Sequence, residues 1–209
     1  MMHSTALNSA TKSVFEKLQK ANFLKKFYLA GGTALALQYG HRESVDLDFF
    51  CAKSFRTEAI IAALSKLGKF KLVNEEENTV DGILDGVKVS FFSYPYKLIR
   101  KMKSFEGVAI ASVADIACMK INAIAGRNAR KDFVDLYFIL EHEGWQIEDV
   151  LHLCDKKFGS ARRDPYHVLK ALVFFEEADM QPEVMTKPSV KWLVVKKFFI
   201  KEAGRIENI

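Results

Sequence analysis

Two aspartates separated by one residue are the most informative chemical feature of this sequence. Asp46 and Asp48 alternate with the apolar residues Leu47 and Phe49, a pattern that predicts a strand. Because side chains at positions i and i+2 share one face of a strand, both carboxylates should point the same way. Neighbouring carboxylates repel each other, and a divalent cation removes that conflict. Since Mg²⁺ is commonly held by one or two carboxylates and substrate phosphates, this pair is a candidate magnesium site.

A pair of glycines precedes the aspartates. Gly31 and Gly32 end an apolar segment, and Thr33 is a candidate N-cap for the short helical pattern that follows. Glycine lets a backbone approach a phosphate closely, and the N–H groups at a helix start can bind it. Arg42 and Ser44, just before the aspartates, are placed to contact phosphates. A glycine pair or an Asp-x-Asp alone is common, but their combination predicts a phosphate cradle beside a metal site.

A second group of charged residues lies in the C-terminal half. Lys120 stands in an apolar helical segment, where it either reaches the surface or faces a site. Arg127 is seven positions further on and so shares its helical face. Gly126 and Asn128 are poor helix formers and predict a break before Asp132. The break would allow Lys120 and Asp132 to meet as one functional unit.

Asp132 has two candidate roles. It could orient Lys120, or it could act as the base that accepts a proton from an attacking hydroxyl. Asp135 follows by three residues and could instead cap a helix or form a structural pair. A structural reading of Lys120 and Asp132 also stays open, in which they only stabilise the fold.

These motifs closely resemble the AbiEii/AbiGii toxin family of nucleotidyltransferases, which belongs to the polymerase-β-like superfamily. The resemblance rests on Gly-Gly-Thr-Ala-Leu at 31–35, on residues 40–50, and on a second block of Lys120, Arg127 and residues 131–137. It extends over nearly the whole chain. The family often has Arg-Asp where this chain has Lys131-Asp132, which is a mild departure.

The resemblance implies an α+β fold in two parts. Residues 1–95 would form a polymerase-β-like nucleotidyltransferase core, a mixed sheet flanked by helices. Residues 96–209 would form a helical bundle that completes the active-site cleft. The catalytic residues would be Asp46, Asp48, Lys120 and Asp132, with the two N-terminal aspartates as metal ligands. The nucleotide-binding residues would be Gly31, Gly32, Thr33, Arg42, Ser44, Arg127 and Lys131.

The resemblance also implies a reaction. A Mg²⁺-dependent enzyme, with Mn²⁺ as the alternative ion, would transfer a nucleoside monophosphate from an NTP to a hydroxyl acceptor, with tRNA favoured. The protein would be the toxin of an abortive-infection toxin–antitoxin pair, and its antitoxin would act as a transcription regulator. Two alternatives remain open: a catalytically weak nucleotide- or RNA-binding protein, and an enzyme that nucleotidylates a partner protein.

Ser90 gives the weakly catalytic alternative some support. Superfamily members often carry a third acidic residue on a later strand, and the candidate strand here is 87–92. Ser90 occupies the expected position, which puts two-metal chemistry in doubt. A single ion held by two aspartates and the triphosphate would still be sufficient.

Composition and charge narrow the classes further. The 209 residues are 49% hydrophobic and 12% aromatic, which is typical of a globular chain. No apolar run approaches the length that spans a bilayer, and the N-terminal residues lack a signal-peptide core. Three scattered cysteines favour a reduced, cytoplasmic setting. Residues 97–131 hold eight basic and two acidic side chains, a local net charge of +6 that favours a polyanionic partner such as nucleotide or RNA.

Hydrophobic periodicity predicts the elements that must position these residues. Strands are expected at 27–30, 46–51, 70–73, 79–84 and 87–92, the last two joined by an Asp85-Gly86 hairpin turn. Helices are expected at 4–20, 33–39, 113–125, 133–142, 147–158, 166–177 and 189–203, and from Ser54 or Thr57 to 67.

Overall fold

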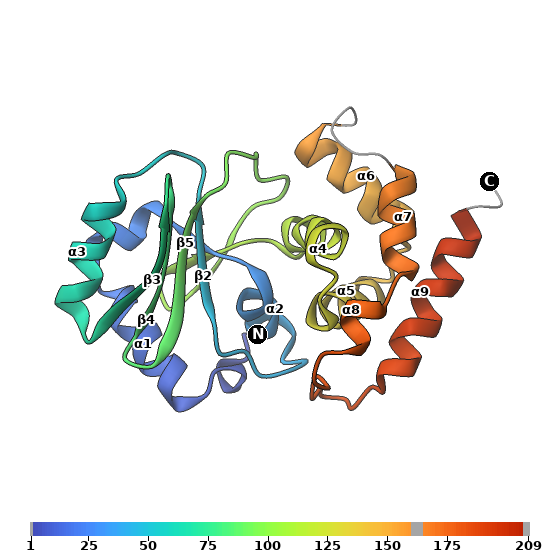
Figure 1. The fold of residues 1–209 in the computed structure, drawn as a ribbon, viewed down its shortest axis with the longest axis horizontal. Helices are drawn as coiled ribbons and strands as arrows, with labels where there is room; N and C mark the ends of the chain where they lie inside the picture. The colour runs from blue at the N-terminus through green and yellow to red at the C-terminus, as the bar shows by residue number, and fades with distance from the viewer. Residues whose placement is uncertain (1, 160–164, 207–209) are drawn as a thin grey trace. The chain divides into compact units, whose positions relative to one another are not determined.

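The computed structural model describes residues 2–159 and 165–206 of the chain (Figure 1). The chain forms two compact units. The first contains the residues up to 97 together with 101–112, and the second contains 98–100 and the residues from 113 onward.

A mixed sheet of seven strands forms the centre of the first unit's described part, in the order β3-β4-β5-β2-β1-β7-β6. The pairs β2–β5 and β1–β7 are parallel, and the other neighbours are antiparallel. The strands are β1 (Tyr28–Leu29), β2 (Leu47–Cys51), β3 (Phe70–Glu76), β4 (Thr79–Leu84), β5 (Val87–Ser93), β6 (Lys103–Phe105) and β7 (Val108–Ile110). This sheet confirms the α+β class expected from the sequence.

The helices of the first unit begin differently from the sequence expectation. The segment expected as one helix at 4–20 contains a short 3₁₀ turn, η1 (Ser4–Ala6), and α1 (Ser9–Gln19). Asn8 separates them, because its side chain caps α1 by accepting a hydrogen bond from the backbone N–H of Thr11 at 2.9 Å. A second 3₁₀ turn, η2 (Asn22–Lys26), leads into β1.

Two further helices complete the first unit. They are α2 (Gly31–Tyr39) and α3 (Thr57–Leu67), and Figure 1 shows α3 beside β3 and β4. Neither Ser54 nor Thr57 caps α3, because the N-cap is Arg56 and no side chain makes the cap hydrogen bond.

Alternating burial explains why β2 and β5 lie at the centre of the sheet. In β2, Leu47 and Phe49 are completely buried, whereas Asp48 between them is partly exposed. Phe49 stacks on Phe91 of the neighbouring strand β5, with 5.2 Å between ring centroids. Burial of such side chains stabilises the sheet and forces the intervening residues onto the opposite face.

Two of the hairpins of this sheet are closed by tight turns that contain a glycine. Asp85 and Gly86, the expected hairpin turn, both have positive φ, at 48° and 86°, which is the backbone of a type I′ turn. Glu106 and Gly107 show the same combination, at 48° and 81°, between β6 and β7. The sequence analysis did not predict this second hairpin, which extends the sheet beyond β1.

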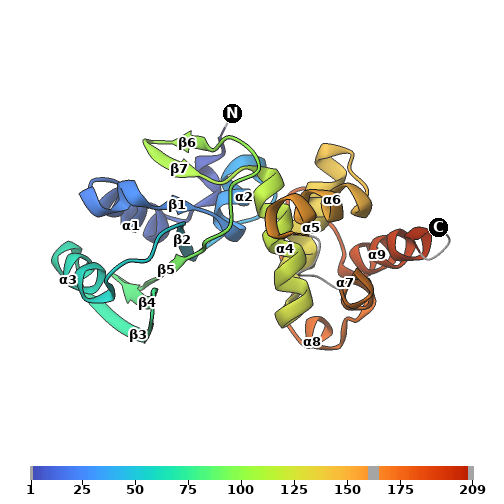
Figure 2. The same ribbon diagram turned by 90° about the horizontal axis from the view of Figure 1, so that it is seen from above.

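The second unit is helical in its described part, as the sequence predicts (Figure 2). Its helices are α4 (Val113–Arg127), α5 (Arg130–Glu143), α6 (Ile147–Phe158), α7 (Pro165–Val173), α8 (Glu176–Asp179) and α9 (Trp192–Ile206). The helix expected at 166–177 is therefore divided between α7 and α8. Phe133 of α5 packs against Phe175, Trp192 and Phe199 at centroid separations of 5.3, 5.8 and 5.5 Å. None of the helices in the described ranges combines the length and apolar character that crossing a bilayer requires.

Candidate active site

The two aspartates of the first unit lie at the beginning of β2. Asp46 directly precedes the strand and Asp48 is its second residue, so their spacing is the one expected for a shared face. Both side chains are partly exposed, whereas Leu47 between them is completely buried. The backbone N–H of Ala30 donates to the carbonyl of Asp48 at 3.0 Å and so places the end of β1 beside β2.

Gly31 brings the start of α2 close to the Asp48 carboxylate. Its φ is +69°, and a Cβ atom at this position would lie 3.1 Å from Oδ2 of Asp48. Glycine therefore suits this position for two reasons: its backbone tolerates the positive φ, and it has no Cβ atom to crowd the Asp48 carboxylate. No side chain caps α2, whose N-cap residue is Ala30. The positive end of a helix dipole thus lies next to a carboxylate, in a position that suits an anion.

Thr33 is not the N-cap of α2, which corrects the expectation from sequence. It lies inside the first turn, and its hydroxyl donates to the carbonyl of Asp46. The Oγ atoms of Thr33 and Ser44 are 2.7 Å apart. Because a hydroxyl has one hydrogen to donate, Ser44 is the donor in this second bond. Both side chains are buried, so they fix the segment that leads into β2.

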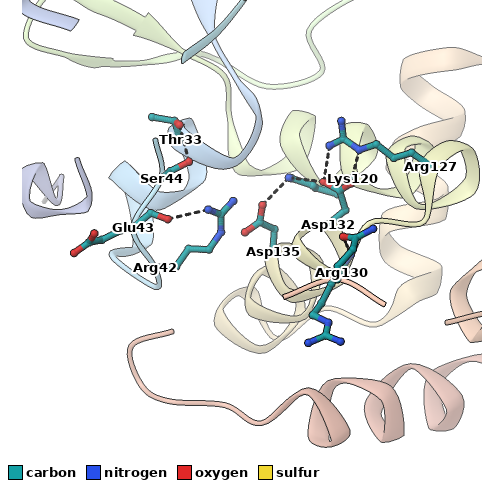
Figure 3. A network of polar contacts seen from close by, with 10 residues as sticks. Thr33, Arg42, Glu43, Ser44, Lys120, Arg127, Arg130, Asp132 and Asp135 are labelled. Atoms are coloured by element: carbon teal, nitrogen blue, oxygen red, sulfur yellow. Dashed lines mark hydrogen bonds and ion pairs between the residues drawn. The ribbon is translucent and has the colours of Figure 1, made fainter. Parts of the chain in front are cut away.

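Arg42 is also largely buried. Its side-chain Nη1 donates to the carbonyl of Glu43 at 2.9 Å, and the residue is 9% exposed (Figure 3). This bond shapes the loop before the aspartates. Contacts of Arg42, Ser44, Gly32 and Thr33 with a phosphate remain predictions.

In the second unit, Lys120 of α4 lies between two aspartates of α5 (Figure 3). Its Nζ is 2.8 Å from Oδ1 of Asp132 and 2.6 Å from Oδ2 of Asp135. The Lys120 side chain is 5% exposed, and both carboxylates are fully buried. Of the two options that the sequence left open for Asp135, a helix cap or a pair, the structure shows a pair, with Lys120.

Arg127 binds the same carboxylate from the other side. Its Nε is 2.8 Å from Oδ2 of Asp132, and its Nη2 is 3.0 Å from Oδ1. This is a bidentate arrangement, which is the strong form of an arginine–carboxylate contact. The expected helix break makes it possible, because α4 ends at Arg127 and Asn128 has a φ of +48°. Arg127 stays 58% exposed and is the solvent-facing member of the network.

The environment of Asp132 favours one of its two candidate roles. Burial by itself would raise the pKa of Asp132, but the charges and hydrogen bonds of Lys120 and Arg127 outweigh it and hold that pKa below its ordinary value of 3.8. A carboxylate whose pKa is lowered and that already accepts three hydrogen bonds is a poor proton acceptor. The geometry therefore suits orientation of Lys120 better than general-base catalysis.

The basic stretch at 97–131 does not act as one surface. Lys120 and Arg130 are buried. Arg130 donates to the carbonyls of Ala178 and Asp179 at 2.8 and 2.9 Å and lies 5.2 Å from the ring centre of Trp192, so it serves the fold. The exposed basic residues are Lys97, Arg100, Lys101, Lys103, Arg127 and Lys131. A role of Lys131 in nucleotide binding stays a prediction.

The residues at the start of β2 fit a hard divalent cation. The described residues contain no cluster of three His, Cys, Asp or Glu side chains that could hold a metal by themselves. Asp46 and Asp48 offer two accessible carboxylates, and Mg²⁺ is commonly bound by such a pair with substrate phosphates supplying further oxygens. Phosphate oxygens of a bound ligand would thus complete the site.

Solved structures with the same fold come from Helicobacter pylori. The JHP933 protein has a TM-score of 0.58 at 16% sequence identity, over 100% of this chain and 94% of that chain. A second H. pylori protein, provisionally described as a nucleotidyltransferase, has a TM-score of 0.57 at 17% identity, over 96% of both chains. At these identities the likeness establishes the fold alone.

Sequence comparison identifies the family. An uncharacterized protein of Aquifex aeolicus (strain VF5) is 38% identical over 207 residues, which cover 97% of this chain and 98% of that protein. The family model described as "Nucleotidyl transferase AbiEii toxin, Type IV TA system" matches residues 13–105 and 98–199. These two matches span most of the chain and include both groups of charged residues, and the chain therefore belongs to the AbiEii family of nucleotidyltransferase toxins.

Proposed function

We propose that this nucleotidyltransferase uses Mg²⁺ to transfer a nucleoside monophosphate from an NTP to a hydroxyl group of tRNA. The observation that carries the proposal is the placement of two accessible carboxylates, Asp46 and Asp48, beside the uncapped start of α2. A triphosphate could receive N–H groups from the helix start, and the carboxylates could share a cation with its oxygens.

The reaction exchanges one phosphorus–oxygen bond for another. The acceptor hydroxyl oxygen bonds to the α-phosphorus, the bond from that phosphorus to the bridging oxygen breaks, and pyrophosphate leaves. The hydroxyl proton passes to solvent or to a base on the substrate side. When bound, the ion neutralises charge that develops on the phosphate oxygens.

The chain's own residues would position the reactants. Gly31 and Gly32 would let the triphosphate approach the backbone, while Thr33 and Ser44 keep the segment before β2 in place. Arg42, Arg127 and Lys131 would contribute positive charge toward phosphates. Lys120 would stabilise negative charge, held in position by Asp132 and Asp135.

The partner follows from the family description. A type IV toxin–antitoxin family implies a nucleotide substrate for the enzyme and an antitoxin partner. We expect the antitoxin to be encoded next to this chain and to act as a transcription regulator.

A labelling experiment tests the proposal. Each of the four labelled NTPs is incubated with the protein and Mg²⁺, once with total tRNA and once with a protein extract. Label should enter tRNA, depend on the cation, and fall by at least about 10²-fold in Asp48→Ala, because an electrostatic stabiliser of the transition state is lost. Glu75→Gln is the control, because Glu75 is an exposed carboxylate on β3.

The same experiment separates the alternatives. Label in protein instead of tRNA would replace the proposed acceptor by a protein. Nucleotide binding without transfer to either pool would favour a weakly catalytic binding protein. Full activity in Asp48→Ala would remove the proposed metal site.

A further inference from the structure

Aromatic rings form a row across three strands on the face of the sheet that carries Asp48. Phe50 follows Asp48 by two residues in β2, so both side chains project from the same face. Phe50 pairs with Tyr28 of β1 on one side and with Phe92 of β5 on the other. The rings are stacked, with centroids 6.1 Å apart for Tyr28 and Phe50 and 5.2 Å apart for Phe50 and Phe92. This aromatic row runs beside the candidate cation site.

The opposite face of the same strands has an aromatic pair of its own. Phe49 and Phe91 stack with 5.2 Å between their centroids and are completely buried in the core. Phe50 and Phe92 differ from them because both remain partly exposed. Large apolar side chains that reach solvent together are typical of binding surfaces. The core is thus complete without Phe50 and Phe92, which leaves them available to a ligand.

The aromatic row ends at Phe92, where one face of the ring is covered by no other ring. Phe50 is the only aromatic side chain among the described residues that makes ring contact with Phe92. On its other side Phe92 pairs with Thr79 of β4, a small and partly exposed residue. A planar group that lies over Thr79 would stack on Phe92 and continue the row.

The surroundings of the row favour a base of single-stranded RNA as this planar group. Tyr94 contacts Phe50 at a centroid separation of 5.6 Å and Tyr96 at 4.8 Å. The exposed Lys97 follows directly, and the exposed Lys101 lies four residues further on. Aromatic rings beside positive charges are the pattern with which proteins bind single strands, because bases stack on the rings and phosphates meet the charges. A lone nucleotide would need only one such ring, whereas a strand uses several.

The distance from Phe92 to Asp48 fits a nucleotide that accepts the transferred group. Phe92 lies one strand across and two residues along from Asp48, so their Cα atoms are about 8 Å apart. A single nucleotide can span this distance. A base on Phe92 would therefore leave the hydroxyl of its own ribose beside the carboxylates of the candidate cation site.

We propose that Phe92 is the stacking platform for the terminal base of the RNA acceptor, with Thr79 beneath the base and Phe50 behind the ring. The inference rests on the proposed function and adds to it the residues that hold the acceptor. Every base has an aromatic face, so stacking accepts any base identity. The site would select an unpaired RNA end, because the bases of a duplex already stack on one another.

Fluorescence of a short single-stranded RNA tests the inference without nucleotidyl transfer. The probe carries 2-aminopurine as its 3′-terminal base, whose emission falls when the base stacks on a ring. The wild-type protein should bind the probe and quench it. Phe92→Leu should raise the Kd about tenfold, because one stacked base is lost, and should restore the emission. Phe92→Tyr keeps a ring and should behave as wild type.

Two further measurements separate stacking from a structural role of Phe92. Thr79→Phe fills the space over Thr79 with its own ring and should raise the Kd as much as Phe92→Leu does. A probe that lacks its terminal base should bind wild type and Phe92→Leu equally. Phe70→Leu is the matched control, because Phe70 is a partly exposed ring that pairs with Leu84 and, through it, with Val87 on the opposite face. This control should leave the Kd unchanged.

The outcomes distinguish failure of this inference from failure of the proposed function. If Phe92→Leu binds and quenches the probe as Phe70→Leu does, Phe92 is not the platform and the proposed function stands. If Phe92→Leu weakens binding of an NTP and not of RNA, the ring serves the donor nucleotide and the inference falls. If wild type binds no RNA and labels protein instead, the proposed acceptor and this inference fall together. Circular dichroism of each variant verifies that the sheet is intact.

Discussion

Asp46 and Asp48 lie partly exposed at the start of a strand, whereas Lys120, Asp132 and Asp135 are almost completely buried between two helices. The first region can exchange ligands with solvent without any change in packing. The second already satisfies its charges internally, because one ammonium group contacts two carboxylates and Arg127 adds a bidentate contact. A charged cluster can thus be arranged either to receive a substrate or to hold one side chain rigidly.

Buried charge networks are weak indicators of stability, because desolvation offsets most of their attraction. Their specific value is positional: a lysine held by two carboxylates cannot easily adopt another conformation. Under the proposed function, the first region would bind the substrate and the second would hold Lys120 in position. Five predictions examine this division, from the largest expected effect to the smallest.

Replacing Lys120 should have the largest effect on stability. Lys120→Met leaves two buried carboxylates facing each other, and breaking a buried pair in this way costs about 3–5 kcal/mol. The melting temperature should fall by about 10 °C. If Lys120 also stabilises charge in the reaction, kcat should fall by at least about 10²-fold at temperatures where the variant is folded.

Lys157 provides a matched control for that experiment. Its Nζ lies 2.6 Å from Oδ1 of Asp115, and both side chains are completely buried in the same unit. Lys157→Met should lose comparable stability and keep its turnover. If both lysine variants keep full turnover when folded, the Lys120 network is structural only.

The pair should also behave as a unit. Residues that act together are non-additive, so Lys120→Ala with Asp132→Ala should transfer nucleotide only slightly worse than either single variant. Strictly additive losses of activity would contradict a shared role for Lys120 and Asp132.

Gly31 tests how closely the first region is fitted. In Gly31→Ala, the positive φ costs about 1 kcal/mol and the new methyl group lies against the Asp48 carboxylate. A displaced carboxylate should lower nucleotidyl transfer by about tenfold. Gly107→Ala isolates the backbone effect, because its φ is +81° and its Cβ would meet no atom within 4 Å. Equal transfer by the two alanine variants would show that the contact between Gly31 and Asp48 is unimportant.

The elements around both regions follow from local patterns, which explains what the sequence could predict. Alternation placed β4 and β5, and the Asp85-Gly86 turn set their pairing. Gly126 and Asn128 indicated the end of α4, and with it the meeting of Lys120 and Asp132. These features depend on residues close together in the chain.

Features that depend on distant residues were missed or misassigned. Thr33 has the right type for an N-cap, but its hydroxyl binds the carbonyl of Asp46 instead. The three-residue strands β6 and β7 are too short for a periodic signal. The hairpin register alone would have paired Thr79 with Phe92, yet only the long-range parallel pairing of β2 with β5 brings Phe50 beside them.

Acid should weaken the buried network at a defined pH. The pKa of Asp132 lies below its ordinary value of 3.8, so its ionised form stabilises the fold above that value. This contribution is lost as the pH falls through the lowered pKa. The difference in melting temperature between wild type and Asp132→Asn should therefore be constant above about pH 4 and shrink below it.

Varying the salt concentration shows whether the pH-dependent difference in melting temperature comes from a buried carboxylate or from surface charges. The Asp132 carboxylate is fully buried, so added salt should leave the melting-temperature difference between wild type and Asp132→Asn nearly unchanged. If this melting-temperature difference disappears in high salt, it comes from charges at the surface. If it grows as the pH falls, the pKa of Asp132 is not lowered.

The smallest effect concerns binding of RNA outside both regions. Lys101 and Lys103 are exposed members of the basic stretch, and Lys103 begins β6. If they contact phosphates, replacing each by alanine should weaken RNA binding about equally for all sequences. The slope of log K against log salt should become less steep by about one per charge removed.

This prediction tests whether RNA binding can be weakened without changing cation binding at Asp48. Lys101→Ala with Lys103→Ala should raise the Kd for tRNA while leaving Mn²⁺ binding at Asp48 unchanged. Lys66→Ala with Lys71→Ala removes two exposed charges from α3 and β3 and serves as the control for net charge. If both double variants change the salt slope equally, the attraction is a property of the overall charge and the basic stretch has no specific role. If only the first pair changes it, the acceptor is held by residues distinct from those that bind the cation and position Lys120.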